Sequence, residues 1–529
     1  MEDLLIRRAT VYDGSGEAPF AGSLTVKNGI ITGVYRAEAP PMRAAEEIDA
    51  RGRALCPGFV DTHTHSDMTL LHDGRQHASL SQGVTTEILG QDGLSYAPMS
   101  RANLNAYAPY LKGLNGQFDD VALDFETVGE YLSRYRNRVG VNIAWLLPHC
   151  ALRLETAGFE NRLLTDKELD RACDIAREAI SQGACGFSTG LSYYPGAFSD
   201  TRELIAICKA VKEAGGVYVT HLRTVFRGRS FSAVEEALTI ARETGVPLHF
   251  SHFRTGGDTI GHADALLEPI DRAVREGLDV TLELYPYPYG ASYAPMFVPM
   301  WANDGGMKEI LKRLSDKAER ARIAREIDES FAKFDGVITY AAHTPGLMGK
   351  SFGEIAASRG MSKGETIAEL LLSEELALSF HDVDPELSAM QREQFDRDVL
   401  SLLKRPYYMV GSDAIHVGRY PHPRGCGSFA RLWRVAREHG FAYETLIERM
   451  AALPSRRFGL KNRGMLRTGY RADMVLLRPE DVCDRATNEE PRLPPLGVDE
   501  CWVNGVRALR NGRPTDALAG QVLPNRREP

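Results

Sequence analysis

The sequence lacks several features that would place it in other classes of protein. No apolar run approaches the roughly 18 residues of a transmembrane helix. The first residues, MEDLLIRRAT, do not combine a basic region with an apolar core, as a secretory signal would. No basic run is long enough to follow a phosphate backbone, and the formal net charge is −8. We therefore expect a cytoplasmic protein that binds neither a membrane nor nucleic acid.

Cysteine is also sparse. The eight cysteines are scattered through 529 residues, and no two of them form a CxxC pair. Such a distribution argues against a disulfide framework and against a structural zinc site made of four thiolates. Reduced, buried thiols are the expected state.

The middle of the chain alternates strand-like runs with helical stretches, the pattern of βα units around a parallel sheet. Helical stretches such as TRELIAICKAVKEAGG and AVEEALTIARETG end in glycine, as helices often do. Eight strands are expected, which is the number in a (β/α)8 TIM barrel. They are PGFVDTHTHSD (from 57), VTTEILGQDG (84), VNIAWLLPHC (141), CGFSTGLSYY (185), VYVTHLRT (217), PLHFSHFR (247), VTLELYPYPY (280) and YYMVGSDA (407).

The two ends of the chain share a different pattern. Residues 1–56 and 456–529 hold short runs that alternate apolar with polar residues and break at glycine, which is typical of hairpins. We expect both ends to form one small β-sandwich domain, with the catalytic barrel over residues 57–455 between them. An insertion at about 291–405 interrupts the barrel. It is either a lid over the active site or a plain structural excursion.

Candidate metal ligands lie where the strands end. His63 and His65 are two residues apart, so on an extended chain both side chains point to the same face. Active sites of such barrels lie at the C-terminal ends of the strands. Closing the barrel would gather there His63, His65, Asp92, His221, His252 and Asp413. Imidazole and carboxylate ligands suit one or two Zn²⁺ ions best, while Mn²⁺, Co²⁺ and Fe²⁺ also fit.

An ordered set of motifs resembles the amidohydrolase superfamily. The motifs are PGFVDTHTHSD, GFSTGLSYYPG, THLR, SHFR, YPY, GSDA, HPRGCGSFAR and PSRRFGLKNRGMLRTGYRADMVLL. Within that superfamily the chain resembles the N-acyl-D-amino-acid deacylases, or D-aminoacylases, over nearly its whole length. The resemblance implies a metal-dependent barrel that hydrolyses an N-acyl-D-amino acid, its small-molecule partner, to a carboxylate and a free amino acid. A homo-oligomer is compatible with it.

The resemblance also implies roles for single residues. His221 and His252 look like ligands of a tightly held zinc, His63 and His65 like those of a weaker or second site. Asp413 looks like the catalytic base, and a carboxylate beside a zinc-activated water can accept its proton and then protonate the departing amine.

Four further residues are candidates for binding substrate. Arg424 is our choice for the α-carboxylate, because a guanidinium binds a carboxylate through two parallel hydrogen bonds. Tyr285 matches a substrate-contacting position of the family, and Arg254 stands where close relatives carry lysine. Tyr193 either lines the pocket or serves packing.

Two departures from the family pattern leave alternatives open. Strand two ends in GQDG, so Asp92 replaces the cysteine of the usual GNCG-like turn. Asp92 is either a substituted ligand that bridges two cations or a turn residue in a one-metal site. Glu283 stands where relatives commonly have aspartate. The alternative functions are hydrolysis of a cyclic amide or another acylated amine, and a non-catalytic barrel scaffold.

Overall fold

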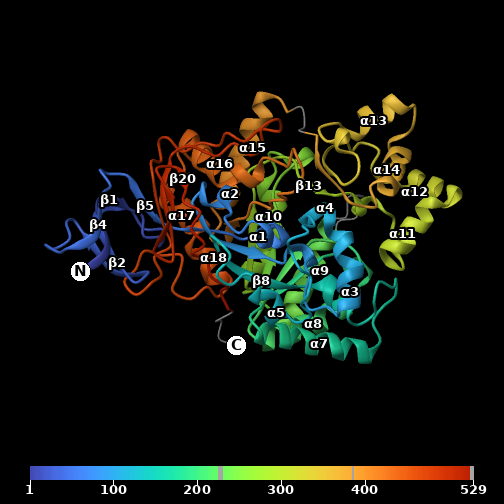
Figure 1. Cartoon of the computed structure of the whole chain (residues 1–529), viewed down its shortest axis with the longest axis horizontal. Helices are drawn as coiled ribbons and strands as arrows, with labels where there is room; N and C mark the ends of the chain where they lie inside the picture. The colour runs from blue at the N-terminus through green and yellow to red at the C-terminus, as the bar shows by residue number, and fades with distance from the viewer. Residues whose placement is uncertain (224–229, 384–386, 525–529) are drawn as a thin grey trace.

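The computed structural model describes residues 1–223, 230–383 and 387–524, and its centre is an eight-stranded parallel barrel (Figure 1). All eight strands expected from the sequence are present. They are β6 (Phe59–Asp61), β7 (Val84–Leu89), β8 (Asn142–Pro148), β9 (Gly186–Gly190), β10 (Val217–His221), β11 (Leu248–Phe250), β12 (Val280–Leu284) and β16 (Tyr408–Val410).

The strands follow one another around the barrel in chain order, from β6 to β12 and then β16. The first and last strands meet, because the Thr62 amide donates to the Val410 carbonyl at 3.3 Å and Thr64 forms a parallel bridge with Ala414. This closure joins residues more than 340 positions apart in the chain. It also places the segments after β6 and β16 side by side.

Helices surround the barrel. Contacts between neighbours run from α7 through α8, α9, α10, α15 and α16 to α2. α7 shows why these segments are helical: Thr165 and Glu168 form a capping box, and Leu169, Ala172 and Ile175 are on its buried face at helical spacing. The bounds of these helices are α2 (His77–Leu80), α7 (Asp166–Ser181), α8 (Thr201–Glu213), α9 (Ser230–Thr244), α10 (Ala263–Arg275), α15 (Ala389–Leu403) and α16 (Arg424–His439). The remaining helices of the barrel and its loops are α1 (Asp67–His72), α3 (Arg101–Tyr107), α4 (Lys112–Asn115), α5 (Val128–Ser133), α6 (His149–Leu154), α17 (Tyr443–Met450) and α18 (Ala452–Arg457).

Both ends of the chain contribute strands to one nine-stranded sheet. β5 from the N-terminal part pairs antiparallel with β17 from the C-terminal part. This sheet has its own core, which includes Leu24, Leu476 and Trp502. Its strands are β1 (Glu2–Val11), β2 (Phe20–Lys27), β3 (Ile30–Arg36), β4 (Ala44–Asp49), β5 (Ala54–Pro57), β17 (Met474–Leu477), β18 (Val498–Val503), β19 (Val506–Arg510) and β20 (Arg513–Pro514).

The long segment between β12 and α15 folds into a small α/β unit. Its three strands form an antiparallel sheet in the order β13, β15, β14. In Figure 1 its helices lie at the end of the molecule opposite the terminal β-domain. Its elements are β13 (Ala291–Tyr293), α11 (Gly306–Ser315), α12 (Lys317–Ser330), β14 (Gly336–Ala341), α13 (Phe352–Arg359), α14 (Lys363–Ser373) and β15 (Leu378–Asp382).

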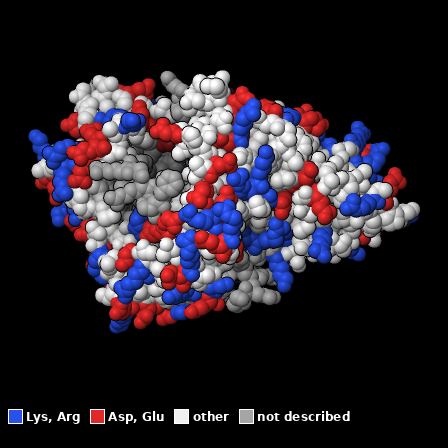
Figure 2. All heavy atoms as spheres, turned by 180° about the vertical axis from the view of Figure 1, so that it is seen from behind, with Lys and Arg blue, Asp and Glu red and all other residues white. Residues whose placement is uncertain are grey.

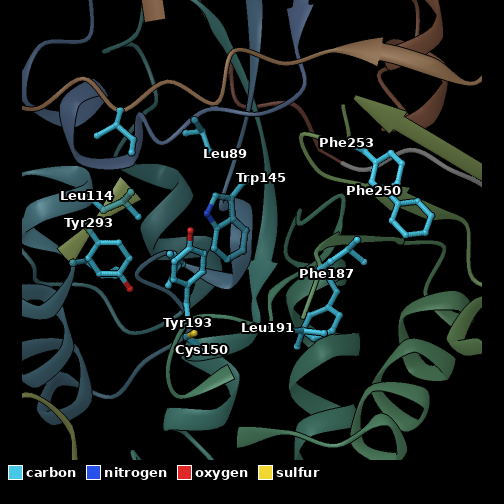
Figure 3. Packing of buried hydrophobic residues seen from close by; sticks show 14 of the residues in the cluster. Leu89, Leu114, Trp145, Cys150, Phe187, Leu191, Tyr193, Phe250, Phe253 and Tyr293 are labelled. Atoms are coloured by element: carbon cyan, nitrogen blue, oxygen red, sulfur yellow. The ribbon is translucent and has the colours of Figure 1, made fainter. Parts of the chain in front are cut away.

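The main hydrophobic core joins the barrel to this inserted unit. Figure 3 shows part of it around Trp145, with Tyr193 and Tyr293 nearby. On the face seen in Figure 2, acidic and basic side chains are intermixed and form no extended patch of one sign. Over the described ranges, no helix combines the length and the apolar character needed to cross a membrane.

Candidate metal centre

Two groups of potential ligands meet at the C-terminal end of the barrel. One consists of His63, His65, Asp92 and Asp413, and the other of Asp92, His221 and His252. Within each group the ligand atoms lie within 4.8 Å of one another. Asp92 belongs to both groups, so its carboxylate lies between them.

His63 and His65 approach the two aspartates together. β6 ends at Asp61, so both histidines lie just beyond the strand, where the bridge from Thr64 to Ala414 keeps the chain extended. Their Nε2 atoms lie 3.5 Å and 3.3 Å from the same oxygen of Asp413, Oδ1. The Nε2 atoms are also 3.5 Å and 3.6 Å from the Asp92 carboxylate.

His221 and His252 form the other side of the centre. His221 is the last residue of β10, and His252 follows β11. Nδ1 of His221 and Nε2 of His252 are 2.9 Å apart, and each lies 3.8 Å from an oxygen of Asp92. Burial, opposed by Asp92 and reinforced by His252, lowers the pKa of His221 to about 4. The imidazole is therefore neutral at pH 7, the form that binds metals.

Three residues of the centre have an unusual backbone conformation. Asp92, His252 and Asp413 have φ values of 56°, 36° and 52°, in the left-handed region that residues other than glycine rarely adopt. Such conformations cost about 1–3 kcal/mol and cluster at functional sites. The Asp92 backbone also packs closely against Gly190, where a Cβ would collide with the Asp92 carbonyl oxygen.

Glu283 orients the histidines from behind. One of its oxygens accepts a hydrogen bond from the His63 ring at Nδ1 (2.7 Å) and another from the His252 amide (2.9 Å), while its other oxygen contacts His249. Although burial opposes ionisation, His249 and His63 lower the pKa of Glu283 to about 2. With a proton on its Nδ1, His63 leaves Nε2 free to bind a cation, the arrangement typical of metal-binding histidines.

Asp413 is paired with Arg424. Its Oδ2 lies 2.8 Å from Nη1 of Arg424, which is the first residue of α16 and has no exposed surface. Burial alone would raise the pKa of Asp413, but Arg424 and His63 outweigh it and hold that pKa well below its ordinary value. Asp413 is therefore ionised at neutral pH.

The centre opens into a cavity of about 210 Å³. Tyr193 and Tyr285 line it, whereas Arg254 and Arg424 are not among the lining residues. The two guanidinium carbons lie 4.4 Å and 4.6 Å from the centre of the Tyr285 ring, and Arg254 donates to the Tyr285 hydroxyl at 2.8 Å. The two cations thus pack against Tyr285, which lines the cavity.

The donor set fits a divalent cation. Nε2 of His63 and Oδ1 of Asp92 are buried and make no hydrogen bond within the described part of the chain. Leaving such atoms without a partner is costly, and a cation between them would supply one. Nitrogen and carboxylate oxygen together suit Zn²⁺, with Mn²⁺, Co²⁺ and Fe²⁺ as other candidates.

Sequence reasoning missed three residues. Glu283 stands out in the sequence as a departure from relatives, and a glutamate inside the apolar run LELYPY is the signal that could have found it. Asp61 accepts hydrogen bonds from the amides of His63 and Ser412, and so ties strand one to strand eight. Asp382, at the end of β15, lines the cavity from the inserted unit. No motif indicated it, because its place depends on how that unit packs.

Comparison with known proteins places the chain among well-defined relatives. The Amidohydrolase family model matches residues 46–508. The chain is 32% identical to a D-aminoacylase of Alcaligenes xylosoxydans xylosoxydans over 98% of this chain and 97% of that one. It is also 32% identical to an N-acyl-D-aspartate deacylase of the same organism, over 98% and 95%. A crystal structure of an N-acyl-D-glutamate deacylase from Bordetella bronchiseptica, complexed with zinc and a phosphonate inhibitor, superimposes with a TM-score of 0.82 at 30% identity, over 99% of both chains.

Proposed function

The chain belongs to the Amidohydrolase family, and on that basis we propose that it is a metal-dependent hydrolase of N-acyl-D-amino acids. The products are a carboxylate and a free D-amino acid. The observation that carries this proposal is the pair of ligand groups sharing Asp92 at the end of the barrel. The similar D-aminoacylase and N-acyl-D-aspartate deacylase support the choice of the amide bond as the bond cleaved and of the D configuration for the substrate.

We assign the metal ligands from the two groups. His63, His65, Asp92 and Asp413 would hold one ion, and His221 and His252 with Asp92 another. Zn²⁺ is the metal we favour, because the donors are imidazole and carboxylate and a related structure contains zinc. When bound, such an ion polarises the amide carbonyl and lowers the pKa of the attacking water to about 7.

Asp413 is the proposed general base. Its Oδ1 faces His63 and His65, while Oδ2 is paired with Arg424, so the carboxylate is oriented and ionised before substrate binds. It accepts the proton of the attacking water as that water's oxygen bonds to the acyl carbon. Asp413 then returns the proton to the amide nitrogen, because an amine leaves readily only when protonated.

Tyr285 and the two arginines are the proposed binding site for the α-carboxylate. The Tyr285 hydroxyl accepts a hydrogen bond from Arg254, which leaves its own proton for a carboxylate in the cavity. Arg254 and Arg424 behind the ring add two positive charges close to that position. Tyr193, whose hydroxyl is 3.3 Å from that of Ser292, would form the opposite wall.

The test is amine release from paired N-acetyl-D- and N-acetyl-L-amino acids, with a hydantoin and a dihydropyrimidine in parallel, each with and without a chelator. We expect release from the D series alone, lost with the chelator and restored by Zn²⁺. Preferred turnover of a cyclic amide would replace the proposal with the cyclic-amide alternative. Bound metal without turnover of any compound would favour a scaffold.

A further inference from the structure

The active-site cavity is small for its proposed task. It measures about 210 Å³, below the range of about 300–1,000 Å³ typical of small-molecule sites. The α-carboxylate and the reacting amide would occupy the part beside Tyr285 and the metal ligands. Little volume is then left for the acyl chain and the amino-acid side chain together.

A second cavity adjoins the first. It measures about 330 Å³, and the two cavities share Met296 and Phe297 as lining residues. The segment after β9 contributes to both cavities. Tyr193 lines the first cavity, while its neighbours Ser192 and Tyr194 line the second. The ring centres of Tyr193 and Tyr293 lie 5.6 Å apart, and Leu191, from the same segment as Tyr193, is another lining residue of the second cavity.

The two shared residues differ in freedom. Phe297 is 2% exposed, and its ring centre lies 4.8 Å from that of Phe331 and 4.9 Å from that of Phe380, so it is held in place. Met296 is only partly buried. Its side chain is unbranched, with three rotatable bonds, which makes methionine adaptable in apolar gaps. Met296 is therefore the residue whose rotation would join the two cavities.

The second cavity is lined mainly by apolar side chains, among them Leu191, Tyr194, Val298 and Phe331. Its charged lining residues already have partners. Arg223 is paired with Glu236 at 2.9 Å, and Glu326 accepts a hydrogen bond from the Trp301 indole at 3.0 Å. Among the described lining residues of the two cavities, Arg223 is the only arginine or lysine, and its charge is already paired with Glu236.

The first cavity also disfavours a second acid. Asp382 contributes a carboxylate to its wall, held by a hydrogen bond of 2.8 Å from the Gly290 amide. A carboxylate on the substrate side chain would be repelled there. The N-acyl-D-aspartate deacylase and the D-aminoacylase match this chain equally well by identity. Identity therefore does not indicate whether the substrate side chain is acidic, and the cavity lining of this chain is the evidence on that point.

We propose that the substrate carries an extended, uncharged apolar chain that passes Met296 and is bound in the second cavity. This inference rests on the proposed deacylase function and specifies its substrate class. This apolar part of the substrate belongs either to the acyl group or to the amino-acid side chain, since both are attached next to the reacting amide. Burying it should raise kcat/KM by up to about fourfold per added methylene.

Two substrate series distinguish these sources. The first varies the acyl group on D-alanine: acetyl, hexanoyl and decanoyl. The second keeps acetyl and varies the side chain: D-alanine, D-norleucine and the D-amino acid with an octyl side chain. We expect kcat/KM to rise at least tenfold along one series, and N-acetyl-D-norleucine to exceed N-acetyl-D-glutamate. Flat or falling values in both series, with N-acetyl-D-alanine still cleaved, would overturn the inference and leave the deacylase function intact. No turnover of any compound would instead overturn the function.

A variant pair tests the second cavity itself. Ser330, the last residue of α12, lines it, whereas Ser315, the last residue of α11, does not. Ser330→Trp should fill the cavity and abolish the gain with chain length while leaving N-acetyl-D-alanine turnover unchanged. Ser315→Trp should behave like the wild type. Met300→Trp, at a lining position that is 47% exposed, serves if Ser330→Trp fails to fold. If kcat/KM still rose with the length of the apolar group in a folded variant with tryptophan at either lining position, the second cavity would not be its binding site.

Discussion

Nη1 of Arg424 lies 2.8 Å from Oδ2 of Asp413, and this ion pair is buried beside the ligand cluster. It joins the proposed base to the proposed carboxylate-binding arginine. The two oxygens of the Asp413 carboxylate have different neighbours. Oδ2 is paired with Arg424, whereas Oδ1 faces His63 and His65.

Asp413→Asn should abolish turnover while leaving metal bound. An amide has almost the same shape but cannot accept the proton of the attacking water, and general-base catalysis is typically worth about 10²–10⁴ in rate. We would measure kcat together with the metal content of the purified protein. The other imidazole and carboxylate donors remain, so the metal content should stay within the wild-type range. Turnover near the wild-type level would remove Asp413 from the role of base.

Arg424→Ala should raise KM for substrates that have a free α-carboxylate. Arg424 contributes one of the two positive charges beside Tyr285. An N-acetyl-D-amino acid amide, which lacks the carboxylate, is the matched control because it loses nothing at that position. The measurement is the ratio of KM between variant and wild type for each compound. Equal ratios for acid and amide would show that Arg424 serves only to hold Asp413.

Asp92→Ala should reduce the number of metal ions per chain. Asp92 is the only residue common to both ligand groups found in the described structure, so its loss removes a donor from each. Asp92→Cys is the matched variant, because a thiolate can also bind metal at this position. Metal content after dialysis against a limiting chelator is the measurement. If Asp92→Ala retained the wild-type content, the aspartate would be a turn residue and not a ligand.

Glu87→Gln should change how stability depends on pH. Burial, with Asp61 nearby, raises the pKa of Glu87 to about 7 from an ordinary value of 4.5. The folded protein therefore binds a proton that the unfolded chain has lost between these values, so this contribution to stability is complete below pH 4.5 and falls as pH rises to 7. Linkage limits the effect to about 3 kcal/mol.

The measurement is the free energy of unfolding in urea at pH 5 and pH 8 for both proteins. Glutamine can still accept the hydrogen bonds that Ser79 and Gln76 donate to Oε1 of Glu87. We expect the decrease in stability between the two pH values to be smaller in the variant. Identical decreases would mean that Glu87 does not titrate in this range.

Much of the fold was readable from the sequence. Eight strand-like runs separated by amphipathic helices predict a parallel barrel, because alternation of strand and helix permits few other architectures. The sequence also allowed the candidate metal ligands to be selected, namely His63, His65, Asp92, His221, His252 and Asp413. Each stands where a strand ends, and in such a barrel those ends surround one cavity.

The tertiary structure decided what depends on contacts between distant segments. Three contacts could not be predicted from the spacing of residues in the sequence, because they join residues far apart in the chain. They are the pairing of Arg424 with Asp413, the hydrogen bond from His63 to Glu283, and the membership of Asp92 in two ligand groups. The place of Asp382 depends on how the inserted unit packs over the barrel, and so does the arrangement in which two cavities share Met296 and Phe297 as lining residues. The sequence by itself determined the architecture and the ligand types, through local periodicity and residue chemistry. Packing of segments far apart in the chain determined the pairings and the shape of the site.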